Sequence, residues 1–189
     1  MLREFIPVNP ILIKITQDII NQLGGKGNFI GAHARLRRFF HPANITINTL
    51  SEKIKFDYFS HELYDFPSHE NKLFNSCKKK LINPNAIPLV VYIASDKDKS
   101  DPDFEPFLNE FPCTFTLSDF KQSLEPLKKI INPLDNMNME GFFIPLVDLL
   151  VSSHGYRFYG TEKSTFSAYA KRLHNLAVDS YNNITLVLI

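Results

Sequence analysis

The sequence has few cysteines, almost no net charge and no long apolar run. Cys77 and Cys113 are too few for a disulfide framework, so they are either two free thiols or one bridge. The formal net charge is +1 and the basic residues are spread along the chain, which argues against a nucleic-acid partner. No stretch approaches the roughly 18 uninterrupted apolar residues of a membrane span, so no transmembrane segment is predicted.

Several short motifs of catalytic and metal sites are also missing. The chain contains no GxSxG, HExxH or CxxC motif and no Walker loop. His61 and His69 lie in an acidic stretch at a spacing that matches no standard metal site, so we expect solvated histidines and no bound metal. The N-terminal segment lacks a sustained apolar core and a small-residue cleavage site, and no signal peptide is predicted.

The composition is that of a globular protein. The chain has 189 residues, of which 44% are hydrophobic and 22% charged, which suits one ordinary domain with a real core. We therefore predict a single domain over 1–189. Its pattern weakens over about 36–67, where we expect an irregular excursion with a possible short strand at 54–59.

Short apolar runs alternate with longer helical patterns along the rest of the chain. The strongest run, PLVVYIA at 88–94, is continuous, rich in β-branched residues and bounded by turn residues, as a central buried strand would be. Further strands are predicted at 28–34, 113–117 and 156–159, a possible edge strand at 183–189, and helices near 10–23, 70–81, 104–111, 118–131, 140–152 and 164–176. This alternation predicts an α/β fold: a Rossmann-like, mostly parallel sheet with helices on both faces.

The stretch from Gly155 onward predicts a strand, a tight turn through Gly160 and a helix that begins with hydroxyl residues. Ser164 and Thr165 lie at the start of this helix, and Thr161 lies in the same turn. A helix N-terminus leaves backbone N–H groups unpaired and carries partial positive charge, so hydroxyls there favour a phosphate site. The alternative is an ordinary N-cap with no ligand nearby.

His33 and Arg35 are two residues apart on a predicted strand and therefore project from the same side of the sheet. Arg35 offers a planar fork of donors suited to phosphate or carboxylate, and both side chains could contact one ligand. The alternative is structural, with Arg35 ion-paired to a surface acid and His33 hydrogen-bonded within the sheet edge.

Two carboxylates are further candidates. Asp148 lies within an apolar helix, where an ionised group is costly to bury unless donors surround it. Guanine presents two donors on one edge and could supply them; the alternative is an exposed acid on the outer face of the helix. Asp96, at the end of the central strand, carries the same ambiguity and could instead cap the following loop.

Four motifs in this order resemble the GDP-fucose protein O-fucosyltransferase family: HAR at 33–35, VYIASD at 91–96, VD at 147–148 and GTEKSTF at 160–166. That resemblance implies a GT-B arrangement of two Rossmann-like halves that face each other across a cleft. This chain resembles the C-terminal, donor-binding half, and the N-terminal acceptor half has no counterpart in it.

The resemblance also implies roles for individual residues. His33 and Arg35 would lie near the sugar and the diphosphate, with Arg35 catalytic, and Asp148 would bind guanine. Ser164 and Thr165 would hold the phosphates, and the nucleotide would pack against Phe166. Asp96 and Thr161 would support the same donor-binding site.

The activity implied is transfer of fucose from GDP-fucose, without a metal, to a hydroxyl on a protein or another acceptor. The family resemblance also suggests the secretory pathway, in the lumen of the endoplasmic reticulum or Golgi. The alternative is a noncatalytic module that binds a guanine nucleotide or a sugar, which the absence of an acceptor half would favour.

Overall fold

The computed structural model describes residues 9–37, 42–60, 63, 73, 77 and 86–185. Within them, four parallel strands form one sheet in the order β3-β2-β1-β4. The strands are β1 (Ile30–Ala34), β2 (Val91–Ser95), β3 (Thr114–Phe115) and β4 (Phe158–Gly160). The longer helices are α1 (Pro10–Gln22), α2 (Ala43–Phe59), α4 (Glu105–Glu110), α6 (Glu140–Ser153) and α7 (Thr165–Thr185).

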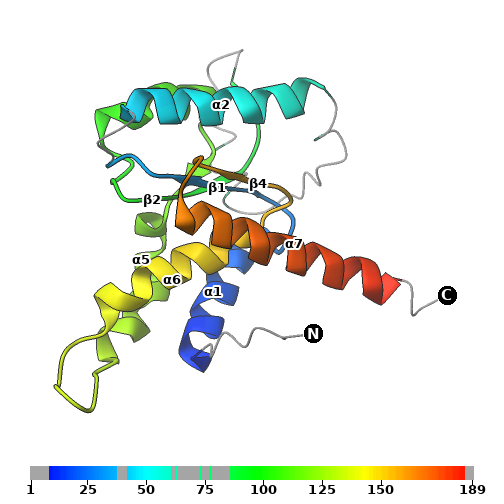
Figure 1. Ribbon diagram of the computed structural model, residues 1–189. Helices are drawn as coiled ribbons and strands as arrows, with labels where there is room; N and C mark the ends of the chain where they lie inside the picture. Colours follow the sequence, from blue (N-terminus) through cyan, green and yellow to red (C-terminus); the bar gives the residue numbers. More distant parts are fainter. Residues whose placement is uncertain are drawn as a thin grey trace.

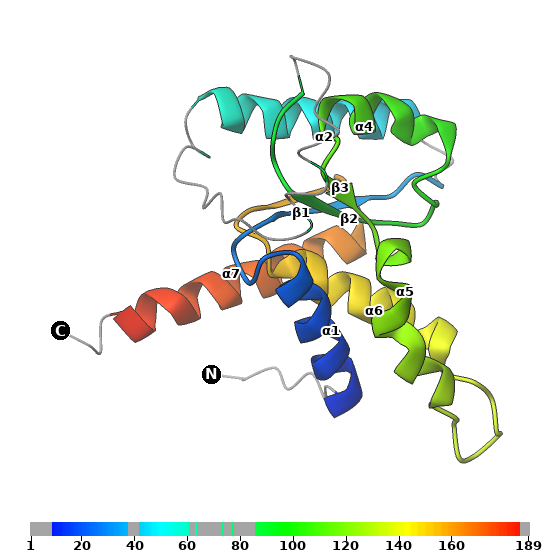
Figure 2. The same ribbon diagram turned by 180° about the vertical axis from the view of Figure 1, so that it is seen from behind.

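Helices cover both faces of this sheet. Figure 1 shows α2 along one face and α1, α6 and α7 against the other, and Figure 2 shows α4 beside α2. The predicted α/β class, with a parallel sheet and helices on both faces, is therefore confirmed, and the arrangement is consistent with a Rossmann-like fold.

The core is divided by the sheet into two apolar clusters. Ile30, Ala32 and Ala34 of β1 pack toward α2 and α4, whereas Phe29 just before β1 packs toward α1 and α6. All five residues of β1 are buried, because helices cover both of its faces. This double burial explains why the strands appear in the sequence as continuous apolar runs without alternation.

Gly31 lets α6 approach β1 closely. A Cβ atom built at Gly31 would overlap the backbone oxygen of Ser152, near the end of α6. Any side chain at this position would push α6 away from the sheet, so the close packing of these two elements requires glycine.

The predicted strand at 54–59 is wrong, because these residues belong to the helix α2. The helix buries Ile47, Leu50 and Ile54 against the sheet but also exposes Phe56 and Phe59 on its outer side. With apolar residues on both sides, its sequence lacks the contrast by which an amphipathic helix is recognised. The expected irregular excursion over 36–67 thus contains a regular helix.

Three other predicted segments differ from the structure or lie partly outside it. The segment 118–131 is broken into η2 (Leu117–Phe120), α5 (Lys121–Leu124) and η3 (Glu125–Lys129). The proposed edge strand at 183–189 is wrong for 183–185, which continue α7, and 186–189 lie outside the described residues. The predicted helix at 70–81 also lies outside them, except for Leu73 and Cys77, both helical; His61 and His69 are not described.

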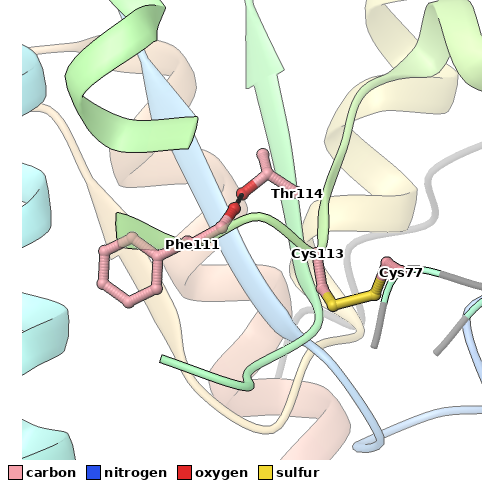
Figure 3. Close-up of a disulfide and its surroundings, with 4 residues drawn as sticks. All are labelled: Cys77, Phe111, Cys113 and Thr114. Atoms are coloured by element: carbon pink, nitrogen blue, oxygen red, sulfur yellow. Dashed lines mark hydrogen bonds between the residues drawn. A yellow bond between two sulfur atoms is a disulfide. The ribbon is translucent and has the colours of Figure 1, made fainter. Parts of the chain in front are cut away.

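The two cysteines form a disulfide. Cys77 and Cys113 are joined with their Cα atoms 5.4 Å apart, at a sequence separation of 36 residues. Figure 3 shows the bond beside the start of β3, where the Thr114 hydroxyl donates to the Phe111 carbonyl at 2.6 Å. The disulfide therefore ties the chain before β2 to the amino end of β3.

Candidate functional site

The candidate site lies at the carboxyl ends of β1 and β4, where the β4–α7 turn meets the end of β1. Thr161, the first residue after β4, joins the two strands through its hydroxyl. Thr161 Oγ1 accepts a hydrogen bond from the Arg35 backbone N–H at 2.9 Å and donates to the His33 carbonyl at 3.0 Å. The start of α7 is thereby held in a defined position relative to β1.

His33 is packed directly against the first turn of α7. It is 4% exposed, and its Nδ1 atom lies 2.6 Å from the Ser167 hydroxyl oxygen. Its ring stacks on Phe166, with ring centroids 4.3 Å apart and an interplanar angle of 24°. A Cβ atom at Gly160 would lie 2.7 Å from Ser167 Cβ, so glycine there allows Ser167 to reach His33.

Ser164 caps α7. Its hydroxyl accepts from the Ser167 N–H at 3.4 Å, and its carbonyl accepts from the Ala168 N–H at 2.9 Å. The backbone N–H groups of Thr165 and Phe166 have no acceptor among the described residues. Ser164 is thus an N-cap, and two donors at the positive end of a long helix remain available to an anion.

An open cleft lies beside this turn. Ser164 and Thr165 line it together with three lysines, Lys53 on α2, Lys163 in the turn and Lys171 on α7. Glu162 also lines the cleft and is paired with Lys53 at 3.1 Å. Lys163 has a φ of 57°, a left-handed conformation that is uncommon for a residue with a side chain. The cleft is positive overall and suits a negatively charged ligand.

Arg35 and Asp96 form an ion pair at the carboxyl ends of β1 and β2. Arg35 Nε lies 3.4 Å from Asp96 Oδ2, and half of the Arg35 side chain is exposed. Asp96 also accepts from the backbone N–H groups of Leu36 and Arg37, at 2.7 and 3.1 Å. Arg35 is therefore ion-paired to an acid, as the structural alternative predicted. Asp96 caps the loop that follows β1 and not the loop that follows its own strand, β2.

Asp148 lies on the same face of the sheet but further from the strand ends. It is partly buried on α6, and Tyr92 of β2 donates a hydrogen bond from its hydroxyl to Asp148 Oδ1 at 2.5 Å. Loss of hydration raises the pKa of Asp148 to about 7, while the Tyr92 hydrogen bond acts in the opposite direction. The alternative of a solvent-exposed acid is thus wrong.

The register of the sheet relates Asp148 to the other candidates. Tyr92 pairs with Gly31, and His33 is two positions further along β1 on the same face. Two residues of a strand span about 7 Å, so the row of Tyr92 and Gly31 lies about that far before His33 along β1. Asp148 is hydrogen-bonded to Tyr92, whereas His33 is hydrogen-bonded to Ser167 and Ser164 caps α7.

No family model matches this chain, and no curated protein matches it either. In the part of the chain that the structure describes, no group of three or more His, Cys, Asp or Glu side chains could hold a metal ion. None of the helices there is long and apolar enough to span a membrane.

The structure brings most of the predicted residues together. His33, Arg35, Thr161, Ser164 and Phe166 gather at the β4–α7 turn; Thr165 is exposed at the same turn, Asp96 adjoins Arg35, and Asp148 lies apart.

Sequence reasoning did not select Tyr92, Ser167 or Gly160 as site residues. Tyr92 carries the one hydrogen-bonding side chain in the apolar run of β2 before Ser95, and a buried tyrosine hydroxyl usually requires a partner. This need for a hydrogen-bond partner is the sequence signal that could have identified Tyr92.

Proposed function

We propose that this chain is the donor-binding half of a glycosyltransferase that transfers fucose from GDP-fucose to a hydroxyl on a protein or another acceptor. The observation that carries the proposal is the β4–α7 turn, which presents two unpaired backbone N–H groups and is joined to Arg35 by Thr161. The four motifs, in the order in which they resemble the O-fucosyltransferase family, support GDP-fucose as the donor.

The diphosphate of the donor would lie at the start of α7. There the N–H groups of Thr165 and Phe166, the Thr165 hydroxyl and the nearby lysines supply donors and positive charge. Arg35 would contribute one charge-assisted hydrogen bond from the end of β1, using the part of its guanidinium group that Asp96 leaves exposed. These groups suffice for nucleotide binding without a metal.

The guanine base would meet Asp148. An ionised carboxylate has two acceptor oxygens, and guanine offers a ring N–H and an exocyclic amine on one edge. Asp148 uses Oδ1 for Tyr92, and Oδ2 has no hydrogen-bond partner among the described residues. A base with two adjacent donors is the ligand that such a carboxylate prefers.

In the proposed reaction, the acceptor hydroxyl oxygen bonds to the anomeric carbon of fucose as the bond from that carbon to the diphosphate oxygen breaks. GDP leaves with the electron pair, and the hydroxyl loses its proton. Negative charge grows on the diphosphate in the transition state, where Arg35 and the α7 N-terminus would stabilise it. The proton of the acceptor hydroxyl would pass to the departing diphosphate or to water.

A calorimetric titration with GDP, ADP and UDP tests the binding step directly. We expect GDP to bind most tightly and the affinity to be unchanged by EDTA. Equal affinities for the three nucleotides, or no binding at all, would contradict the proposal, and loss of binding in EDTA would contradict the metal-free site.

One observation favours a second candidate, a noncatalytic nucleotide-binding module. Arg35 is already paired with Asp96, so the ion pair competes with the diphosphate for the guanidinium. Incubation with GDP-fucose and peptide acceptors separates the two functions. Release of GDP with a fucosylated acceptor supports the enzyme, whereas binding without transfer supports the module.

The secretory compartment is part of the same proposal. Disulfides persist in oxidising compartments and are rare in reducing ones, so the Cys77–Cys113 bond supports a lumenal or extracellular location. Alkylation of free thiols in protein isolated from its source would test it, because a bonded pair resists the reagent until a reductant is added.

A further inference from the structure

The phenol of Tyr92 is held in one position within the core. Tyr92 is fully buried in β2, with Phe29 in an edge contact at 6.4 Å between ring centroids and Phe120 at 6.3 Å. Its hydroxyl donates to Asp148 Oδ1 at 2.5 Å. Because the ring cannot move without disturbing the core, this hydrogen bond also fixes the direction in which Asp148 points.

Few charged groups act on this pair. Burial raises the pKa of Tyr92 well above its ordinary value, and the negative charges of Asp148 and then Asp119 raise it further, so the phenol remains a donor. Asp119, on η2, is paired with Lys99 at 2.6 Å. Within the described residues of α1, α7, η3 and the sheet, Tyr92 is the one ionisable group that shifts the pKa of Asp148.

We propose that Tyr92 is a positioning residue that aims Asp148 at the nucleobase and favours its ionised form, and thereby determines which purine the site prefers. This inference rests on the proposed function and deepens it. A hydrogen bond to a carboxylate stabilises its ionised form, so the Tyr92 hydroxyl opposes the effect of burial. Without it, Asp148 would be protonated over a wider range of pH.

The two protonation states of Asp148 match different bases. The ionised carboxylate accepts only, and it suits the two neighbouring donors of guanine. The protonated acid has one donor and one acceptor, and it suits adenine, whose corresponding edge has a ring nitrogen acceptor beside an amine donor. The preference for GDP over ADP should therefore rise with pH as Asp148 ionises near pH 7.

The test measures the affinities for GDP and ADP from about pH 5.5 to 8.5, around the raised value of Asp148. In the unaltered protein the GDP-to-ADP ratio should rise through about pH 7. In Tyr92→Phe the rise should move to higher pH and the ratio at pH 7 should fall roughly tenfold, because a drop of the ionised fraction from about one half to about one tenth lowers the proportion of ionised to protonated acid from about 1 to about 0.1.

Tyr159→Phe is a matched control. Tyr159 is also buried and also donates to a carboxylate, Asp57 on α2, at 2.6 Å, but from the opposite face of the sheet. Its substitution should lower stability and leave the pH dependence of the ratio unchanged. Asp148→Asn cannot titrate, so its ratio should be flat with pH, and this keeps the inference testable if Tyr92→Phe does not fold.

Three results would overturn the inference: a Tyr92→Phe curve that superimposes on that of the unaltered protein, an equal shift in Tyr159→Phe, or an Asp148→Asn ratio that still rises with pH. Failure of the proposed function is distinguishable, because the unaltered protein would then bind no GDP at any pH. The carboxyl ¹³C resonance of Asp148 would still report the effect of Tyr92, and an unchanged titration midpoint in Tyr92→Phe would refute it independently.

Discussion

Substitution of Gly160 by alanine should disturb the site through packing alone. A Cβ atom at Gly160 would lie 2.7 Å from Ser167 Cβ and 2.9 Å from Ser167 Oγ. Both distances are shorter than a Cβ atom normally makes to a carbon or oxygen atom that is not bonded to it. Ser167 cannot retreat freely, because its hydroxyl is 2.6 Å from His33 Nδ1. The first turn of α7 must therefore move away from β4.

Overpacking of a well-packed core typically costs about 1–3 kcal/mol, and we expect Gly160→Ala to lie in this range. Urea denaturation measures it, as a lower transition midpoint with an unchanged slope. The affinity for GDP should fall as well, because the N–H groups of Thr165 and Phe166 move with α7.

Gly141→Ala is the matched control for this substitution. Nothing lies within 4 Å of a Cβ atom at Gly141, which is exposed in the first turn of α6. Alanine there should be neutral or stabilising by at most about 1 kcal/mol.

Ser167→Gly in the Gly160→Ala background removes the atoms that clash and should restore part of the loss, with a coupling energy of about 0.5–3 kcal/mol. A free energy of unfolding for Gly160→Ala within about 0.5 kcal/mol of the unaltered protein would refute the packing argument.

Three further predictions address other parts of the molecule. Arg35→Ala should weaken GDP binding by about 1.5–3 kcal/mol in calorimetry. It should have little effect on stability, because two backbone N–H groups still donate to Asp96. An unchanged affinity would show that Arg35 does not contact the nucleotide. Reduction of the Cys77–Cys113 bond, which spans 36 residues, should lower the free energy of unfolding by roughly 3–4 kcal/mol, and equal urea midpoints with and without reductant would contradict this. Burial lowers the pKa values of His154 and His174 from 6.5, so their contribution to stability is complete above about pH 6.5 and declines as pH falls. A variant with both histidines replaced by glutamine should lose less stability than the unaltered protein between neutral and acidic pH. An equal loss would show that the two histidines do not cause the pH dependence of stability.

The parallel sheet and most of its helices can be predicted from the amino-acid sequence alone. The runs that form β1 and β2 are apolar on both faces because helices cover both sides of the sheet. Such a run predicts a buried strand even when the helices that pack on it are unknown. Ser164 and Thr165 likewise indicated a helix start through local hydrogen-bonding chemistry. Local signals of this kind are sufficient where each residue's preference agrees with its final environment.

Other features depend on contacts between segments that are distant in the sequence. The helix α2 exposes Phe56 and Phe59, so its pattern lacked contrast and its last turn was wrongly predicted as a strand. The disulfide depended on whether distant segments bring Cys77 and Cys113 together. Whether Asp148 was exposed or buried was undecided from periodicity, because its environment is set by Tyr92, 56 residues away in the sequence. Contacts between such distant residues depend on how the helices dock on the sheet, and no local pattern encodes that docking.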